Sequence, residues 1–158
     1  TSGMSNLLIQ SCSQSKAEVS EPTPAFDVYA GYFYKILKKA IRTEEFRGDT
    51  DLRILSAKHG ILETDRPIKS YDQRMTESRA RELNKDVVDD IETTVEDGGY
   101  DRIVLNMGKV YQQSLDGLTD RVSVPVSAIE GGGIGEKGGA LYQFIRGDDT
   151  IPTVVNDV

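Results

Sequence analysis

Residue types that build specialised sites are almost absent from this sequence. Its 158 residues include one cysteine, Cys12, one histidine, His59, and no tryptophan. A single cysteine excludes an internal disulfide framework. Because cysteine and histidine are the usual ligands of structural zinc, we expect no structural metal, and nothing in the sequence indicates another cofactor.

Long apolar runs and a secretion signal are also missing. No apolar run approaches the roughly 18 residues that a membrane span needs, and no charged, then apolar, then small-residue signal opens the chain. We therefore expect a cytoplasmic protein. Residues 1–3 precede Met4 and resemble the remainder of a cleaved tag. Residues 4–158 are enough for one domain with a core and too few for two, so we expect a single α/β domain.

Positive charge is in short supply as well. The 19 Lys and Arg residues oppose 26 Asp and Glu residues, which gives a net charge of −7 and a pI near 4.8. Binding to long duplexes depends on neutralising phosphates with Lys and Arg, so the balance disfavours nucleic acid as a partner. One cluster runs against this balance, because Lys35, Lys38, Lys39 and Arg42 fall close together on a predicted helix.

Short apolar runs nevertheless recur along the chain and predict buried strands. Consecutive apolar residues, typical of a parallel sheet covered on both faces, occur in 6–10, 52–55 and 100–106. A fourth run, 122–126, carries Pro125 and is expected at an edge or to end early.

Helical patterns alternate with these strands. Helices are predicted over 28–46 with Asp27 as N-cap, from Thr76 to the Gly98-Gly99 pair, over 110–115, and after Gly139. The alternation predicts a three-layer α/β/α fold with a mostly parallel sheet of four to five strands and right-handed crossovers.

Polar residues follow the predicted strands at their carboxyl ends, where ligands bind in open α/β sheets. The segment LRILSAKHGILETDRPIKSYDQRM passes from a buried strand into small and polar residues, and the first strand ends in SCSQSK. A glycine-rich stretch, GGGIGEKGG, precedes the last helix and suits either a phosphate contact or a substrate-covering loop. We expect one pocket with these ligand-binding residues: Ser11, Cys12, Ser13, Lys16, Tyr29, Ser56, Lys58, Gly60, Tyr71, Asn106, Gly133 and Gly135.

The segments LLIQSCSQSK, ILSAKHGILETDRPIKSYDQRM and GGGIGEKGG together resemble small microbial domains related to the YaaA peroxide-stress proteins. The resemblance implies a fold related in part to uracil-DNA glycosylases, and a pocket that recognises a nucleobase or acts on an N-glycosidic bond. The family's helix-hairpin-helix DNA-binding element has no obvious counterpart here.

The chemistry of an N-glycosidic bond would need a carboxylate and donors that hold the departing base. Asp72 is the candidate carboxylate and His59 the candidate donor, so these two are the predicted catalytic residues. Asn106 would read a base edge, and Tyr29 or Tyr71 would stack on the ring. Structural roles compete with each: Asp72 as a helix cap, His59 as a turn residue and the tyrosines as core.

Three alternatives stay open at this point. In the first, the protein is a non-catalytic nucleotide sensor whose glycine-rich stretch contacts the phosphate. In the second, it is a DNA-interacting stress-response protein that binds through the basic helix face. In the third, Cys12 acts as a nucleophile, activated by Lys16 and His59.

Overall fold

The computed structural model describes residues 5–12, 20–69, 74–129, 134–147 and 153–155. Its centre is a six-stranded sheet in the order β4-β3-β1-β6-β7-β8. The four inner strands are parallel, and the two edge strands run antiparallel to their neighbours. The strands are β1 (Asn6–Ser11), β3 (Thr50–Ser56), β4 (Gly60–Glu63), β6 (Arg102–Asn106), β7 (Val126–Ile129) and β8 (Thr153–Val155).

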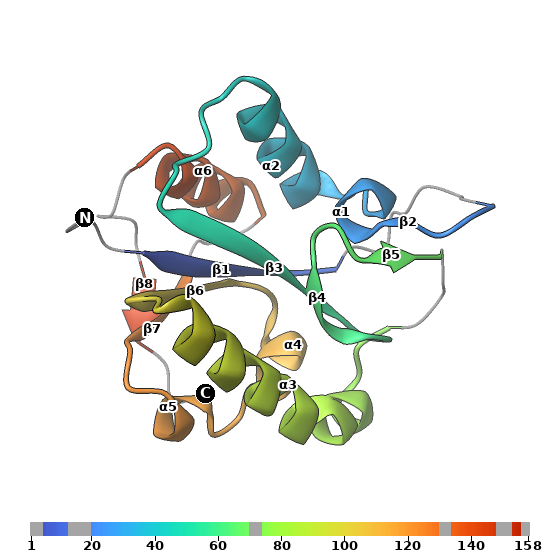
Figure 1. The fold of residues 1–158 in the computed structure, drawn as a ribbon, viewed down its shortest axis with the longest axis vertical. Helices are drawn as coiled ribbons and strands as arrows, with labels where there is room; N and C mark the ends of the chain where they lie inside the picture. Colours follow the sequence, from blue (N-terminus) through green and yellow to red (C-terminus); the bar gives the residue numbers. More distant parts are fainter. Residues whose placement is uncertain (1–4, 13–19, 70–73, 130–133, 148–152, 156–158) are drawn as a thin grey trace.

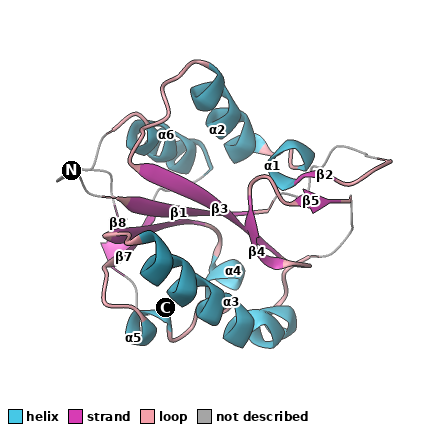
Figure 2. Cartoon of the chain, in the orientation of Figure 1, coloured by secondary structure: helices cyan, strands magenta, loops and turns pink. Residues whose placement is uncertain are grey.

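Helices cover both faces of this sheet (Figure 1). On one face lie α2 (Tyr32–Arg42) and α6 (Ile134–Ile145); on the other lie α3 (Glu77–Gly98), α4 (Lys109–Gln113) and α5 (Leu118–Arg121). The short α1 (Ala25–Val28) and a two-stranded sheet of β2 (Thr23–Pro24) and β5 (Pro67–Ile68) sit to one side, as Figure 2 shows. The predicted three-layer α/β/α class is confirmed. Among the described helices, none is long and apolar enough to cross a membrane.

Alternation along β1 divides the core into two parts. Leu7 and Ile9 are fully buried in the cluster that includes the apolar face of α3. Leu8 points to the opposite face and packs in the cluster of α2 and α6, which contains Leu37 and Phe144. Because side chains alternate between faces, Gln10 lies on the same side as Leu8, toward α2 and α6.

The long helix α3 matches its prediction. The Thr76 hydroxyl accepts a hydrogen bond from the backbone N–H of Arg79, and Gly99 ends the helix in the left-handed conformation at φ 65°. The predicted apolar stripe is buried along its whole length. Local sequence signals are enough here because the caps and the stripe agree.

The helix predicted over 28–46 is wrong at both ends. Tyr29 is extended, with φ −77° and ψ 135°, and Gly31 is the N-cap of α2. At the other end, Thr43 donates its hydroxyl to the Lys39 carbonyl, and Glu44 takes a φ of 60°, which ends the helix at Arg42. Asp27 lies within the separate helix α1 and is not the N-cap.

Two other boundaries also differ from the predictions. The run 122–126 contributes only its last residue to β7, because Pro125 has no N–H for the strand ladder. The last helix begins at Ile134, so Gly135, Gly138 and Gly139 are helical. The sheet also has an additional strand, β4, which pairs back onto β3.

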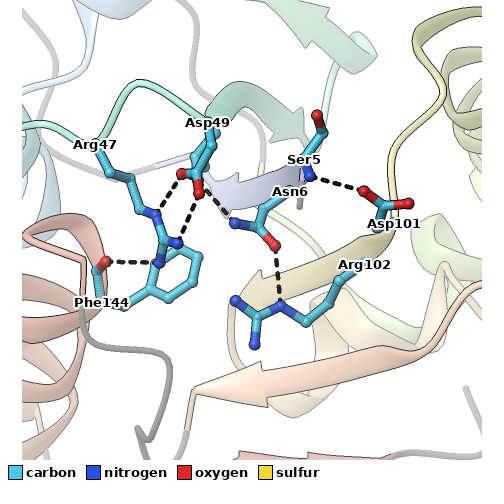
Figure 3. A network of polar contacts seen from close by, with 8 residues as sticks. Ser5, Asn6, Arg47, Asp49, Asp101, Arg102 and Phe144 are labelled. Carbon is cyan, nitrogen blue, oxygen red and sulfur yellow. Dashed lines mark hydrogen bonds and ion pairs between the residues drawn. The ribbon is translucent and has the colours of Figure 1, made fainter. Parts of the chain in front are cut away.

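The amino ends of the parallel strands are closed by paired polar groups (Figure 3). Arg47 forms a two-point ion pair with Asp49, at 2.5 and 2.9 Å, and donates to the Phe144 carbonyl at 3.2 Å. Buried Asn6 donates to Thr50 at 3.2 Å and accepts from Arg102 at 3.0 Å. Hydrogen bonding to Arg47 holds the pKa of Asp49 below its usual value.

These side chains satisfy one another at the amino edge, and the ring of Phe144 lies between two of them. The guanidinium carbons of Arg47 and Arg102 are 4.8 and 5.3 Å from its centroid. These paired polar groups stabilise the amino edge of the sheet. The candidate site lies at the opposite edge, where the parallel strands end.

Candidate functional site

A pocket of about 230 Å³ opens at the carboxyl end of β1, beside the start of α2. We call it the carboxyl-edge pocket. Its position is the one that open α/β sheets use for ligands. It is lined by Gln10, Ser11, Cys12, Gly31, Tyr32, Phe33 and Tyr34.

Gln10 supplies this pocket with a buried amide. Its side chain is 1% exposed, and its Oε1 accepts a hydrogen bond of 2.7 Å from Asn106 Nδ2 on the adjacent strand β6. Gln10 Nε2 is 3.4 Å from the Ser11 carbonyl oxygen, a long distance for such a bond. That oxygen already accepts from the Tyr34 hydroxyl at 2.9 Å. The Gln10 amide therefore keeps donor capacity.

Asn106 lies behind Gln10 and is also 1% exposed. Among the described residues, none donates to its Oδ1, and Asn106 is not among the described residues that line the carboxyl-edge pocket. Buried polar groups without a partner are uncommon in folded proteins. Asn106 thus orients Gln10, whereas the sequence analysis expected it to touch the ligand directly.

Two buried or half-buried phenols adjoin the lining residues of the pocket. Tyr34 lines the pocket and is 1% exposed, and the Tyr111 hydroxyl lies 3.2 Å from Sγ of the lining residue Cys12. Burial raises the pKa of Tyr34 well above its ordinary value, and burial together with Cys12 raises the pKa of Tyr111. Both phenols are consequently neutral hydrogen-bonding groups at physiological pH. The Cys12 thiol contacts a phenol, which does not stabilise a thiolate as a cation would.

A second pocket, of about 290 Å³, lies between α2 and α6. We call it the interhelix pocket. Tyr32, which is 47% exposed, is a wall of both pockets, so they are neighbours. The interhelix pocket is lined by Tyr32, Ile36, Lys39, Gly135, Gly138, Gly139 and Tyr142. The predicted contact residue Gly135 therefore does line a pocket, from the first turn of a helix.

The residues predicted around His59 form a turn between β3 and β4. The Ser56 hydroxyl is buried and accepts from the backbone N–H groups of Lys58 and His59, both at 3.1 Å. Arg79 of α3 donates to the carbonyls of Ala57 and Lys58, at 2.7 and 2.9 Å. The turn is thus held by its own backbone and by α3.

None of these turn residues is among the described residues that line either pocket. His59 is exposed, and partial burial, Lys58 and Arg66 lower its pKa, so the imidazole is neutral at pH 7. The predicted pocket wall of Ser56, Lys58, His59 and Gly60 stays a prediction, because its expected partners Ser13, Lys16 and Tyr71 lie outside the described residues. A hydroxyl residue followed closely by glycine occurs where a strand turns into a tight hairpin, and it also occurs where a strand ends at a ligand site.

Replacing Gly60 by alanine tests this structural role. Gly60 has a φ of +75°, while a Cβ there would meet only Val87 Cγ2 at 3.8 Å, so the strain comes from the backbone alone. We expect Gly60→Ala to lower the free energy of unfolding by about 1–2 kcal/mol in urea titrations. Affinity for a ligand of the carboxyl-edge pocket should stay unchanged. A large loss of affinity with wild-type stability would contradict a purely structural turn.

Tyr29 cannot stack on a ligand. It is fully buried and packs on Tyr34, with ring centroids 5.3 Å apart. Its carbonyl accepts a 2.6 Å hydrogen bond from Lys38, whose pKa is lowered by burial. Tyr32, three residues later, is the tyrosine that faces the pockets. Because the backbone at Tyr29 is extended and not helical, the rings of Tyr29 and Tyr32 point in directions that helical spacing does not predict.

Five predicted residues lie outside the described residues: Ser13, Lys16, Tyr71, Asp72 and Gly133. The predicted pair of Asp72 and His59 is therefore not located as a pair. Ser11 and Cys12 line the carboxyl-edge pocket, and their contact with a ligand stays a prediction. Within the described part of the chain, no group of three or more His, Cys, Asp or Glu side chains is placed to hold a metal ion.

The sequence analysis missed Gln10, Tyr32 and Lys39 as pocket residues. One signal was available for Gln10, which ends an otherwise apolar strand on the face shared with Leu8. An amide at such a position must find partners or serve a ligand. Tyr32 and Lys39 required knowledge of where α2 begins.

The sequence model of DUF6884, described as a family of unknown function, matches residues 7–143. The chain belongs to this family. The match includes both β1 and most of α6, so the DUF6884 domain contains both pockets. No curated protein matches the sequence.

One solved structure, titled "Crystal structure of AF0587, a protein of unknown function", is similar to this DUF6884 chain. The TM-score is 0.53 at 14% sequence identity, over 94% of this chain and 47% of that one. The chain thus spans about half the length of AF0587. At this identity the similarity supports the fold alone.

Proposed function

We propose that this protein recognises a nucleobase in the carboxyl-edge pocket. The observation that supports the proposal is the buried pair of Gln10 and Asn106. Asn106 fixes the Gln10 amide from behind, and among the described residues Gln10 Nε2 has only a long contact, so it keeps a donor at the pocket. A base edge presents carbonyl or ring-nitrogen acceptors that complement this donor.

The surroundings of the pair also suit a planar, partly apolar ligand. Phe33 and Tyr34 supply aromatic walls, and Tyr32 is exposed at the opening. The volume of about 230 Å³ is below the ~300–1,000 Å³ common for drug-sized ligands and favours a single ring system. The resemblance to YaaA-related domains, which motivated a base-binding pocket, stays a prediction.

The test is binding of free bases and nucleosides, measured by calorimetry. At least one of uracil, cytosine, adenine, guanine or their nucleosides should bind, and Gln10→Leu should weaken it by about 1–3 kcal/mol, roughly 5- to 150-fold. Gln143→Leu is the matched control, since Gln143 is exposed on α6. If the whole panel fails to bind, or if the two variants behave alike, base recognition by Gln10 is wrong.

The same panel separates catalysis from sensing. A glycosidase would release free base from a nucleoside, more slowly in Asp72→Asn, whereas a sensor would bind without product. A DNA-interacting role is less favoured, because two of the four basic residues of α2 make contacts other than those of a free basic surface. Lys38 is bonded to the Tyr29 carbonyl, and Lys39 lines the interhelix pocket.

A further inference from the structure

Helix α6 contains more glycine than a helix of 12 residues tolerates without a reason. Gly135, Gly138 and Gly139 all lie within Ile134–Ile145, and each glycine in a helix interior is unfavourable relative to alanine. Packing explains one of the three. A Cβ on Gly138 would lie 2.5 Å from Cε2 and from the hydroxyl oxygen of Tyr32, so glycine is what allows the ring to lie where it does.

The other two glycines are not explained by packing. A Cβ on Gly135 or Gly139 would meet nothing within 4 Å, so alanine would fit at both positions and favour the helix. Both residues line the interhelix pocket. Their bare backbone therefore keeps open a volume that a side chain would reduce, which is expected where a ligand approaches the main chain closely.

The side chain of Lys39 brings a cation to the same pocket, where no described side chain pairs with it. Lys39 shares one face of α2 with Tyr32 and Ile36, and all three line the pocket. Among the described residues, none forms an ion pair or a side-chain hydrogen bond with its ammonium group. The carboxylate of nearby Glu45 is engaged by Arg146 at 2.9 Å and by the Tyr142 hydroxyl at 3.2 Å. In a chain of net charge −7, a lysine that no described carboxylate pairs with favours an anionic ligand at this pocket.

We propose that the interhelix pocket holds the phosphate of a nucleotide whose base occupies the carboxyl-edge pocket. The proposal rests on the base recognition proposed above. The two pockets share Tyr32 as a wall, so the sugar of one ligand would cross its ring between them. Each pocket alone is smaller than common small-molecule sites, while the two together fall within the ~300–1,000 Å³ range. The ligand class is thus a nucleoside monophosphate.

The test compares each nucleoside with its 5′-monophosphate by calorimetry at low salt, using uridine, cytidine, adenosine and guanosine. We expect at least one monophosphate to bind tenfold or more tightly than its nucleoside. Lys39→Gln should reduce this advantage to about twofold or less and leave nucleoside affinity unchanged. Lys35→Gln is the matched control, because it removes the same charge from an exposed position on the same helix and should keep the advantage.

A second variant tests the open backbone. Gly139→Leu should keep or raise the thermal midpoint, because leucine favours the helix, and should weaken monophosphate binding at least tenfold with little effect on the nucleoside. Equal binding of nucleoside and monophosphate, or equal effects of Lys39→Gln and Lys35→Gln, would overturn the phosphate assignment alone. Absence of any binding across the panel would overturn base recognition and the phosphate site together.

Discussion

Replacing Phe144 by alanine should lower the free energy of unfolding by about 3–5 kcal/mol, the largest stability effect expected for a single residue here. The ring is fully buried in the core between α6 and the sheet. It also lies between the guanidinium groups of Arg47 and Arg102, a contact of about 0.5–2 kcal/mol with each. Alanine would leave a cavity and remove the surface on which both cations pack.

Phe144→Leu is the control that separates these two contributions. Leucine retains much of the volume but has no aromatic face, so its loss should be about 1–2 kcal/mol, well below that of alanine. Urea titrations of both variants would measure the difference. The Arg47 bond to the Phe144 carbonyl uses the main chain and should survive in both variants. Equal losses for leucine and alanine would show that the cation contacts, and not the packing, dominate at this position.

The fold was predictable where independent local signals coincide. Helix α3 has a threonine cap, an uninterrupted apolar stripe and a terminal glycine pair, and the structure follows all three. Likewise, β1 and β6 contain short apolar runs buried on both faces of the sheet, and the end of β3, Ile54–Ser56, is buried in the same way. A strand that is buried on both faces can contain few polar residues, so apolar runs of this length identify the inner strands.

Prediction failed where a local signal fits two structures. The residues after β3 combine a hydroxyl, a glycine and polar side chains, and this pattern serves a hairpin turn or a ligand loop. The pairing of β4 with β3 and the Arg79 contacts show that these residues form a hairpin turn, and contact of their side chains with a ligand stays a prediction. Similarly, the glycines of α6 suggest a loop by propensity, yet they lie in a helix whose apolar residues Leu141, Phe144 and Ile145 are buried in the core.

The candidate site followed from topology better than from residue chemistry. The carboxyl end of β1 does open on a pocket, which is lined by Ser11 and Cys12, although binding of a ligand there stays a prediction. The sequence-based prediction gave weight to rare residues such as the single histidine, His59, and did not include the glutamine Gln10. A glutamine is common, and what makes this one informative is its 1% exposure, which no sequence pattern states directly.

The amide pair itself gives the sharpest combined prediction. Asn106→Leu removes the only donor that the described residues provide to Gln10 Oε1 and leaves that oxygen buried. We expect the free energy of unfolding to fall by about 1–3 kcal/mol, the desolvation penalty of an unpaired polar group. Base affinity should also fall, because Gln10 loses the bond that fixes its orientation.

The double variant Gln10→Leu with Asn106→Leu distinguishes pairing from packing. Replacing both members of a buried hydrogen-bonded pair by apolar groups can be nearly neutral, so the double variant should be more stable than Asn106→Leu alone. Base binding should not return with the stability, since the polar groups are gone. Urea titrations of the four proteins of the cycle, with calorimetry on each, measure both quantities. If the stability losses of the single variants simply add, the two amides do not act as a pair, and the observation that supports base recognition is lost.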